Sequence, residues 1–333
     1  MRALATISTK VHYRLANAAI GPIYMASLAT IQRRQSELSY WIWRTTRSRP
    51  RLNRNSVLQF IPSAVKVEYG IIPGRLLARI AFHFRAPRLK YLVEVIEQLR
   101  LLPFSDVVIA IDTNSADSLN MIRTFCVPNE IKVHTDLKNP RRLVWTHREA
   151  MRSAFSNFDY FLYIEDDILL TPAAVSLWHE RLPSLTKRGF LPSFLRVEEN
   201  RKGGLVASDF TRPDTRENVL IVDGKPYLHT TFPYQAMWLY DKETMRAFMS
   251  SDTFERGYPR DLHKILENAA LGFTFERIGE SYRSRYLLPL TTSMKVDPRC
   301  YVYHMPSNYG RRFVTHPANL GTLSVDHLIS SSA

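Results

Sequence analysis

The amino-acid sequence predicts an α/β fold with a mixed, mostly parallel central sheet flanked by helices. Between Leu76 and Ile164, short apolar runs of strand length alternate with stretches in which apolar residues recur at helical spacing. Such alternation is typical of right-handed β-α-β connections in a mainly parallel sheet. The 333 residues include only 12 glycines, which argues against a dinucleotide fold built on repeated Gly-rich turns.

The individual elements of this part of the chain follow from the same patterns. Apolar runs predict buried strands at 76–84 and 106–112, and a third and a fourth strand are expected at 131–137 and 160–164. The segments between them predict helices at 87–102, 115–125 and 146–155. In the first helix one apolar face is formed by Leu89, Leu92, Val93, Ile96 and Leu99.

The pattern is less regular after Asp167. Helices are expected at 172–185, 242–249 and 259–271, and an aromatic strand at 232–240. The segment 196–223 is polar and contains Gly203-Gly204 and Pro213-Asp214, so a loop is expected there. The tail from Lys295 is expected to be mostly irregular.

The net charge is unevenly distributed and divides the chain into two regions. The whole chain carries +14, but residues 1–55 alone hold ten Lys or Arg against a single acid, Glu37. Such a basic arm binds nucleic acid, anionic lipid or another acidic surface, or is a solvated tail. We therefore expect an arm at 1–55 and a single folded domain at 56–333.

An uncharged stretch within the arm, residues 15–31, bears on localisation. It contains Gly21 and Pro22, is too polar for a spanning helix, and lacks the features of a signal peptide. Its basic flanks favour a helix lying on a membrane surface. We expect a cytoplasmic protein, peripheral at a membrane, with a Golgi-type membrane-anchored lumenal protein as the alternative. The two cysteines, Cys126 and Cys300, favour a reducing compartment.

Polar side chains follow three of the predicted strands at the point where each strand ends. Arg85 follows the first strand, Asp112-Thr113-Asn114 ends the second, and Glu165-Asp166-Asp167 follows the last. Because ligands of parallel sheets bind beyond the carboxyl ends of the strands, we expect these groups to converge on one cleft.

The three consecutive carboxylates are the most informative feature of the sequence. Like charges at one strand end repel, so Glu165-Asp166-Asp167 needs a cation or another compensation. Mg²⁺ and Mn²⁺ prefer carboxylate oxygens and leave positions open for phosphate oxygens, so a metal there can neutralise a departing diphosphate. An acidic loop with an exposed helix cap is the alternative for the same residues.

The surroundings of these carboxylates resemble the A-type (GT-A) glycosyltransferases. From Thr146 to Asp167 the chain has a helix with a basic residue near its start, the Asp159-Tyr160 pair, an apolar strand and the acidic triplet. Glu-Asp-Asp followed by apolar residues and Pro172 looks especially like the N-acetylglucosaminyltransferase type. The resemblance covers residues 76–305 and implies the GT-A nucleotide-diphospho-sugar transferase fold.

This resemblance implies roles for the two halves of the domain and for the triplet. Residues 76–167 would form the nucleotide-binding half and residues 168–333 the acceptor half. Asp167, the last acid, would be the direct ligand of Mn²⁺ or Mg²⁺. Glu165 and Asp166 would bind ribose or metal-bound water, and the Glu at the first position leaves the coordination open.

Four other residues become candidate contacts of the donor nucleotide. By the resemblance, Asp112 and Asn114 would lie near its base and ribose, Arg85 near the nucleotide, and Arg148 near the diphosphate. The alternatives are a turn formed by Asp-Thr-Asn and a solvated helical arginine.

The resemblance also implies a general base on the acceptor side. Asp261 precedes Gly272-Phe273 by eleven residues, a spacing similar to that of the family base, although Arg260 stands where the family has Glu. A helix N-terminus would stabilise the ionised form of Asp261. Glu267, in the middle of the same predicted helix, is the rival, and either acid is otherwise a helix charge.

A late histidine often completes the metal site in this family. His304, after the apolar Tyr301-Val302-Tyr303, fits that role, and His316 is a second option. Tyr234 and Gln235 are candidates to face the acceptor, although core packing is the commoner use of such aromatic segments. The remaining candidates, for neutralising the leaving diphosphate, are Lys295, Arg311 and Arg312.

The sequence therefore predicts a metal-dependent hexosyl- or N-acetylhexosaminyl-transferase that uses a UDP-sugar and inverts the anomeric configuration. The expected acceptor is a glycan, polysaccharide or glycolipid. Competing classes are a non-catalytic carbohydrate- or membrane-binding relative, and nucleic-acid binding through the arm. Because no nucleic-acid motif is present and the candidate centre is acidic, no nucleic-acid partner is expected. A phosphatase would usually need an Asp where Phe84-Arg85 ends the first strand.

Overall fold

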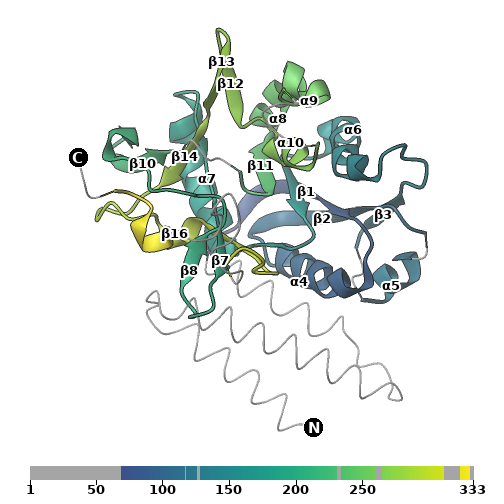
Figure 1. Ribbon diagram of the computed structural model, residues 1–333. Helices are drawn as coiled ribbons and strands as arrows, with labels where there is room; N and C mark the ends of the chain where they lie inside the picture. Colours follow the sequence, from purple (N-terminus) through teal and green to yellow (C-terminus); the bar gives the residue numbers. More distant parts are fainter. Residues whose placement is uncertain are drawn as a thin grey trace. The chain divides into compact units, whose positions relative to one another are not determined.

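The central sheet has five strands in the order β11-β4-β1-β2-β3. In the computed structural model (Figure 1) these are β1 (Ile72–Phe82), β2 (Phe104–Thr113), β3 (Glu130–Val133), β4 (Tyr160–Glu165) and β11 (Met237–Asp241). The first four are parallel to their neighbours, and β11 joins β4 antiparallel. The predicted mixed, mostly parallel sheet is thus confirmed.

The described part of the chain comprises residues 69–116, 118–125, 128–230, 234–259, 265–310 and 323–330. All of it belongs to one of the two units into which the chain divides, Asn55–Ala333. The basic arm predicted at residues 1–55 and its uncharged stretch lie outside the described residues. Within the described residues no helix combines the length and apolarity that crossing a membrane requires.

Helices cover both faces of the central sheet, which explains why its inner strands are continuous apolar runs. In Figure 1, α4 (Leu89–Arg100) and α5 (Ser118–Phe125) lie on one face, and α6 (Thr146–Ser153) lies on the other. With α6 lie α8 (Lys242–Met249), α9 (Asp252–Arg256) and α10 (Ile265–Leu271). The helix predicted at 242–249 is confirmed with both bounds.

Two smaller sheets lie beside the central one. The first has the order β16-β8-β7-β15-β5, with β5 (Ile168–Leu170), β7 (Leu195–Glu199), β8 (Leu205–Ala207), β15 (Tyr301–His304) and β16 (Leu323–Ser324). The second has the order β6-β14-β10-β9, with β6 (Leu191–Pro192), β9 (Val219–Val222), β10 (Lys225–His229) and β14 (Tyr286–Pro289). Along the chain, α7 (Pro172–Thr186) connects β5 to β6. Just before β14, β12 (Phe275–Ile278) and β13 (Ser281–Ser284) form a projecting hairpin.

The prediction of a loop at 196–223 was wrong, because β7, β8 and β9 lie in that segment. In β7 the charged residues Arg196 and Glu198 are buried, and each is neutralised by partners elsewhere in the chain. Their charge made the strand look solvated, since a lone sequence does not show which buried charges have partners.

The antiparallel pairing of β5 with β15 is the feature that most affects the candidate site. The chain turns at Asp166 and Asp167 directly after β4, and β5 then runs beside β15, with Ile168 opposite His304. The backbone N–H of Met305 also donates to the carbonyl of Asp167 at 3.0 Å. This pairing holds the end of β15 against the acidic triplet.

The core between the strands β4 and β11 and the helices α6, α8, α9 and α10 is rich in aromatic side chains. Trp238 stacks on Tyr240 with ring centroids 4.6 Å apart, and both side chains are fully buried. Gly272, which ends α10 at φ +56°, lies against these rings. A Cβ at Gly272 would come within 2.6 Å of atoms of Trp238 and Tyr240, so only glycine fits this position.

We expect Gly272→Ala to destabilise the fold more than a strained backbone angle alone explains. Gly279→Ala is the matched control, because Gly279 has φ +60° and open space around its Cβ position. Denaturant unfolding should show a loss of about 1 kcal/mol for the control. It should show a loss roughly 1–3 kcal/mol larger for Gly272→Ala. Equal losses would mean that the aromatic core adapts without cost.

Candidate functional site

A cleft of about 920 Å³ lies beyond the carboxyl ends of β1 and β4. A cleft of this size is sufficient for a small-molecule ligand. Its walls come from the end of β1, the 3₁₀ helix η2 (Pro140–Trp145), α10 and the residues that follow β15. Glu165, Asp166 and Asp167 lie on its surface. The strand ends meet here as expected for a parallel sheet.

The acidic triplet is mostly buried in spite of its charge. Glu165 is the last residue of β4, while Asp166 and Asp167 form the turn to β5 and are 4% and 3% exposed. Buried carboxylates that repel one another require nearby cations or bound protons. Both kinds of compensation are present at this site.

Arg88 is the first compensating cation. It ends the 3₁₀ helix η1 (Ala86–Arg88), and its Nε donates to Oδ2 of Asp166 at 2.8 Å. Its Nη2 donates to Oδ1 of Asp166 at 2.5 Å and to Oδ2 of Asp167 at 2.9 Å. Arg85 was predicted from the sequence, whereas Arg88 was not. Arg88 could have been considered too, because it lies three residues after Arg85, one 3₁₀ turn further on, and faces the same edge of the sheet.

His304 is the second compensating group. Its Nε2 lies 3.3 Å from Oδ2 of Asp167, and its Nδ1 contacts the carboxylate of Glu198. Asp167 Oδ1, by contrast, is buried and has no hydrogen-bond partner among the described residues. The predicted pair of Asp167 and His304 is therefore brought together, with one carboxylate oxygen still unsatisfied.

The surroundings shift the pKa values of these groups in different directions. Burial, together with the charge of Asp167, raises the pKa of Glu165 to about 8. Burial also raises the pKa of Asp166 to about 6, although the hydrogen bond from Arg88 opposes this. Burial alone would raise the pKa of Asp167 as well, but His304, Arg88 and Arg196 outweigh it and hold this pKa below its ordinary value.

The pKa of His304 is raised to about 9. Burial lowers it, but hydrogen bonds to Asp167 and Glu198 more than offset that effect. The pKa values thus fall from Glu165 to Asp167, so Asp167 is the carboxyl of the three that ionises most readily. The most ionised carboxylate is the one with the unsatisfied oxygen.

These residues fit a divalent metal in the chemistry of their donors. A carboxylate oxygen and an imidazole nitrogen are both ligands of Mn²⁺ and related ions. The orphaned Oδ1 of Asp167 is the atom that an ion would satisfy. Among the described residues, however, no group of three or more His, Cys, Asp or Glu is arranged to hold a metal. Any further ligand of an ion there would come from the substrate, from water or from residues outside the described part of the chain.

A third cation, Arg196, forms the wall beside the triplet. It makes a two-point ion pair with Asp209, at 2.7 and 2.6 Å, and its guanidinium lies 5.0 Å from the ring centroid of Tyr234. The hydroxyl of Tyr234 donates to Glu165 at 3.2 Å. Tyr234 was predicted from the sequence, but Arg196 and Asp209 were not. Both lie in the segment that was predicted to be a loop, and the sequence does not show that they form an ion pair.

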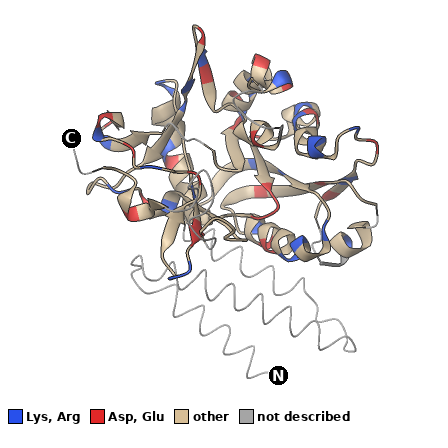
Figure 2. Cartoon of the chain, viewed as in Figure 1, with Lys and Arg blue, Asp and Glu red and all other residues tan. Residues whose placement is uncertain are grey.

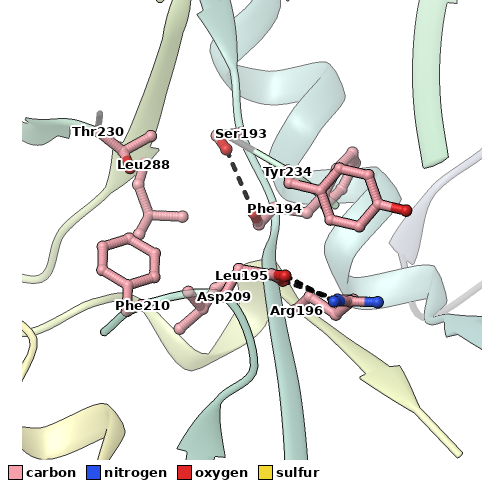
Figure 3. Close-up of a pocket in the computed structure, with 9 residues that line it drawn as sticks. All are labelled: Ser193, Phe194, Leu195, Arg196, Asp209, Phe210, Thr230, Tyr234 and Leu288. Carbon is pink, nitrogen blue, oxygen red and sulfur yellow. Dashed lines mark hydrogen bonds and ion pairs between the residues drawn. The ribbon is translucent and has the colours of Figure 1, made fainter. Parts of the chain in front are cut away.

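Figure 3 shows a small hollow on which Arg196, Asp209 and Tyr234 also lie, together with Ser193, Thr230 and Leu288. It has no room for a water molecule. The predicted acceptor contact Gln235 packs near this region and is only 2% exposed. It accepts from the N–H of Phe194 at 3.2 Å and donates to Ser193 at 3.0 Å, so its polar atoms are engaged within the protein.

Glu267 also lines the cleft, on α10, which packs against η2. Its Oε2 is buried without a hydrogen-bond partner among the described residues. Leu266, Leu271 and Phe275 line the same cleft. Asp261, the other candidate base, lies outside the described residues, as do Arg311, Arg312 and His316. Lys295 pairs with Asp326 at 3.0 Å and does not line the cleft.

The predicted donor contacts fall into two groups. Arg85 is exposed and lines the cleft. Asp112 and Asn114 do not line it. Both oxygens of Asp112 bind Arg79, at 3.0 and 2.8 Å, and one also binds His134 at 2.8 Å. Asn114 accepts from the N–H of Phe84 at 2.8 Å, which ties together the chain segments after β1 and β2.

Arg148 also lies away from the cleft, contrary to the expectation of a diphosphate contact. The side chain is 3% exposed and donates to the carbonyls of Thr253 and Phe254 at 2.7 and 2.6 Å. It donates to two further carbonyls, those of Asn268 and Ala269, at 3.3 Å each. Burial lowers its pKa to about 10, which leaves it charged at neutral pH. Arg148 joins α6 to α9 and α10.

Comparison with known proteins gives little beyond this geometry. No protein-family model matches the chain, and no curated protein matches its sequence. The structure matches 140 chains among solved structures. One of them is described as a "putative nucleotide-diphospho-sugar transferase" from Desulfovibrio desulfuricans G20. It is 12% identical, with a TM-score of 0.30, over 58% of this chain and 73% of that one. A likeness of this size does not assign an activity.

Charge on the described part is interspersed and not gathered into one basic face (Figure 2). Acidic and basic residues both occur across its helices and strands. The strong positive charge of the chain belongs mainly to residues 1–55. Nothing in the described part therefore adds support to nucleic-acid binding.

We expect Arg148→Ala to lower stability and to leave ligand binding in the cleft unchanged. The substitution leaves four backbone carbonyls without their donor, so denaturant unfolding should show a loss of roughly 3 kcal/mol. Arg152→Ala, one turn further along α6, is the control. Arg152 pairs with Glu149 and Glu255 at the surface, and its loss should cost at most about 1 kcal/mol. A stable Arg148→Ala protein with weakened nucleotide binding would restore Arg148 as a donor contact.

Proposed function

We propose that this protein is a metal-dependent glycosyltransferase. It would transfer a sugar from a nucleotide-diphosphate donor, expected to be a UDP-sugar, to a glycan, polysaccharide or glycolipid. Asp167 carries the proposal. It is an ionised, buried carboxylate with one unsatisfied oxygen, it faces His304, and it lies in a large cleft at the carboxyl edge of a parallel sheet. Such an oxygen is suited to a divalent cation.

Asp167 and His304 are the residues that would hold the metal. A bound Mn²⁺ or Mg²⁺ supplies Lewis-acid neutralisation of the diphosphate as it departs. The absence of a third side-chain ligand in the described part of the chain agrees with a site whose other positions are filled by phosphate oxygens and water. Asp166, held by Arg88, would accept a hydrogen bond from metal-bound water or ribose.

Three cationic or donor groups that line the cleft support binding of a diphosphate. Arg85 and Arg141 are exposed and form no ion pair with a described residue. His83 lines the cleft as well, and burial together with Arg85 and Arg88 lowers its pKa. Guanidinium groups bind phosphate oxygens through two parallel hydrogen bonds. These residues would therefore hold the nucleotide and its phosphates.

On α10, Glu267 would act as general base toward the acceptor. An acceptor hydroxyl oxygen attacks the anomeric carbon of the donor sugar, and its proton passes to the free carboxylate oxygen of Glu267. The bond between the anomeric carbon and the phosphate oxygen breaks, and the nucleoside diphosphate leaves with the electron pair. Attack opposite to the leaving group inverts the anomeric configuration. Asp261 remains the alternative base.

The first experiment is calorimetric titration of the full chain with UDP, with and without Mn²⁺. We expect UDP binding that requires Mn²⁺ and that falls at least about 10-fold in Asp167→Asn. Asp106→Asn is the matched control, because Asp106 pairs with Arg75 on the surface near the amino end of β2. It should bind like the wild type.

Other results would change the proposal in defined ways. UDP binding that is equal without Mn²⁺ and in Asp167→Asn would remove the metal from it. If no nucleotide diphosphate binds under any condition, the non-catalytic carbohydrate-binding alternative takes its place.

The choice between the two candidate bases is tested by comparing Glu267→Gln with Asp261→Asn. We expect Glu267→Gln to lower kcat by about 10²- to 10⁴-fold, because the acceptor hydroxyl loses its proton acceptor. The affinity for UDP and Mn²⁺ should stay within about 3-fold, since the base does not touch the donor phosphates. Full activity of Glu267→Gln with an inactive Asp261→Asn would transfer the role to Asp261. The product's anomeric configuration, read by NMR, tests inversion.

A further inference from the structure

Glu198 is a buried carboxylate that none of the roles above uses. It lies on β7, is 1% exposed, and its neighbour Arg196 is already paired with Asp209. A buried carboxylate is costly unless hydrogen bonds surround it. Glu198 meets this condition entirely through residues at and after the end of β15.

The two oxygens of Glu198 have different partners. Oε1 contacts Nδ1 of His304 at a short hydrogen-bonding distance. Oε2 accepts from the backbone N–H groups of Tyr309 and Gly310, at 2.8 and 2.7 Å. One carboxylate thus binds both the ring of His304 and the backbone of Tyr309 and Gly310, five and six residues further along the chain. Its position is fixed by three donors.

The contact with Nδ1 decides what the other ring nitrogen can do. A carboxylate only accepts hydrogen bonds, so the Nδ1 of His304 must carry the hydrogen. Without a metal, Nε2 also carries a hydrogen, which it directs at Asp167 across 3.3 Å; a bound metal would replace that proton and take up the Nε2 lone pair. A metal-binding histidine needs this lone pair, and carboxylate partners on the far nitrogen are the usual way of holding it.

We propose that Glu198 is the positioning residue of the metal centre, acting through His304. The inference rests on the proposed function, since it assumes an ion between Asp167 and His304. By the same carboxylate, Glu198 also holds Tyr309, whose ring stacks beside His304 with centroids 5.8 Å apart and lines the cleft. Metal binding and the shape of this wall are therefore set by one side chain.

Glu198→Gln separates this role from a purely structural one. The amide has one acceptor oxygen, which the N–H groups of Tyr309 and Gly310 would retain. Its NH₂ group would then face His304 and donate to Nδ1. This moves the ring hydrogen to Nε2 and removes the lone pair from the side that faces Asp167. The fold keeps its backbone contacts while the histidine loses its ability to bind a metal.

The experiment measures Mn²⁺ binding to the full chain in the presence of UDP, from the EPR signal of free Mn²⁺. We expect Glu198→Gln to weaken binding about 10- to 100-fold. His304→Ala should also weaken it, and the double variant Glu198→Gln/His304→Ala should match His304→Ala within about 2-fold. Glu199→Gln, the next residue on β7 with its side chain toward the other face, is the control and should bind like the wild type.

Each other outcome counts against the inference. Wild-type affinity in Glu198→Gln, or losses that add in the double variant, would leave Glu198 with a structural role alone. Failure of the wild type to bind Mn²⁺ with UDP would instead overturn the metal part of the proposed function and this inference with it. If Glu198→Gln does not fold, Glu198→Asp serves in its place. Aspartate keeps the negative charge, but its side chain is one methylene shorter, so the carboxylate lies farther from His304. If Glu198 acts through His304, the effect of Glu198→Asp on Mn²⁺ binding should likewise disappear in the His304→Ala background.

Discussion

Repulsion among three consecutive carboxylates, two of them buried, is the constraint around which the centre of this protein is arranged. Glu165 ends β4, whose inner residues are buried, and Asp166 and Asp167 follow it at 4% and 3% exposure, where water screens their charges less than at the surface. Each is compensated differently. Tyr234 donates to Glu165, which binds a proton more readily than usual, Arg88 covers Asp166, and His304 with Arg88 holds Asp167 ionised.

The compensating groups come from distant parts of the chain and are brought together by the two five-stranded sheets. Arg88 follows β1, whereas Arg196 lies on β7 and His304 ends β15. The second sheet brings the latter two together, since β15 pairs with β7 on one side and with β5 on the other. Because β5 begins one residue after Asp167, this sheet is attached to the triplet by the shortest possible connection.

Buried ion pairs recur throughout the domain, and their net energies are small. Arg79 with Asp112, and Arg196 with Asp209, are both bidentate pairs in nearly dry surroundings. The loss of hydration offsets most of the attraction in such pairs, whereas removal of one partner leaves a costly buried charge. Their effect here is geometric. Arg79 with Asp112 locks the register of β1 against β2, and Arg196 with Asp209 fixes the cleft wall beside Tyr234.

The sequence alone was enough to predict the parallel sheet and the acidic centre. Three of the four parallel strands are mainly apolar runs, and the triplet stands out because three acids follow one another at the end of the last strand. The sequence could not show which groups meet the triplet and its histidine, because Arg88, Arg196 and Glu198 carry no local pattern and are brought in by pairing across long separations. Nor could it show that Arg148 and Asp112 are buried and paired within the protein. A charged residue beside a strand end has the same local pattern whether it binds a ligand or the protein's own backbone and side chains. Burial and the presence of a partner separate these cases, and both are properties of the packed chain.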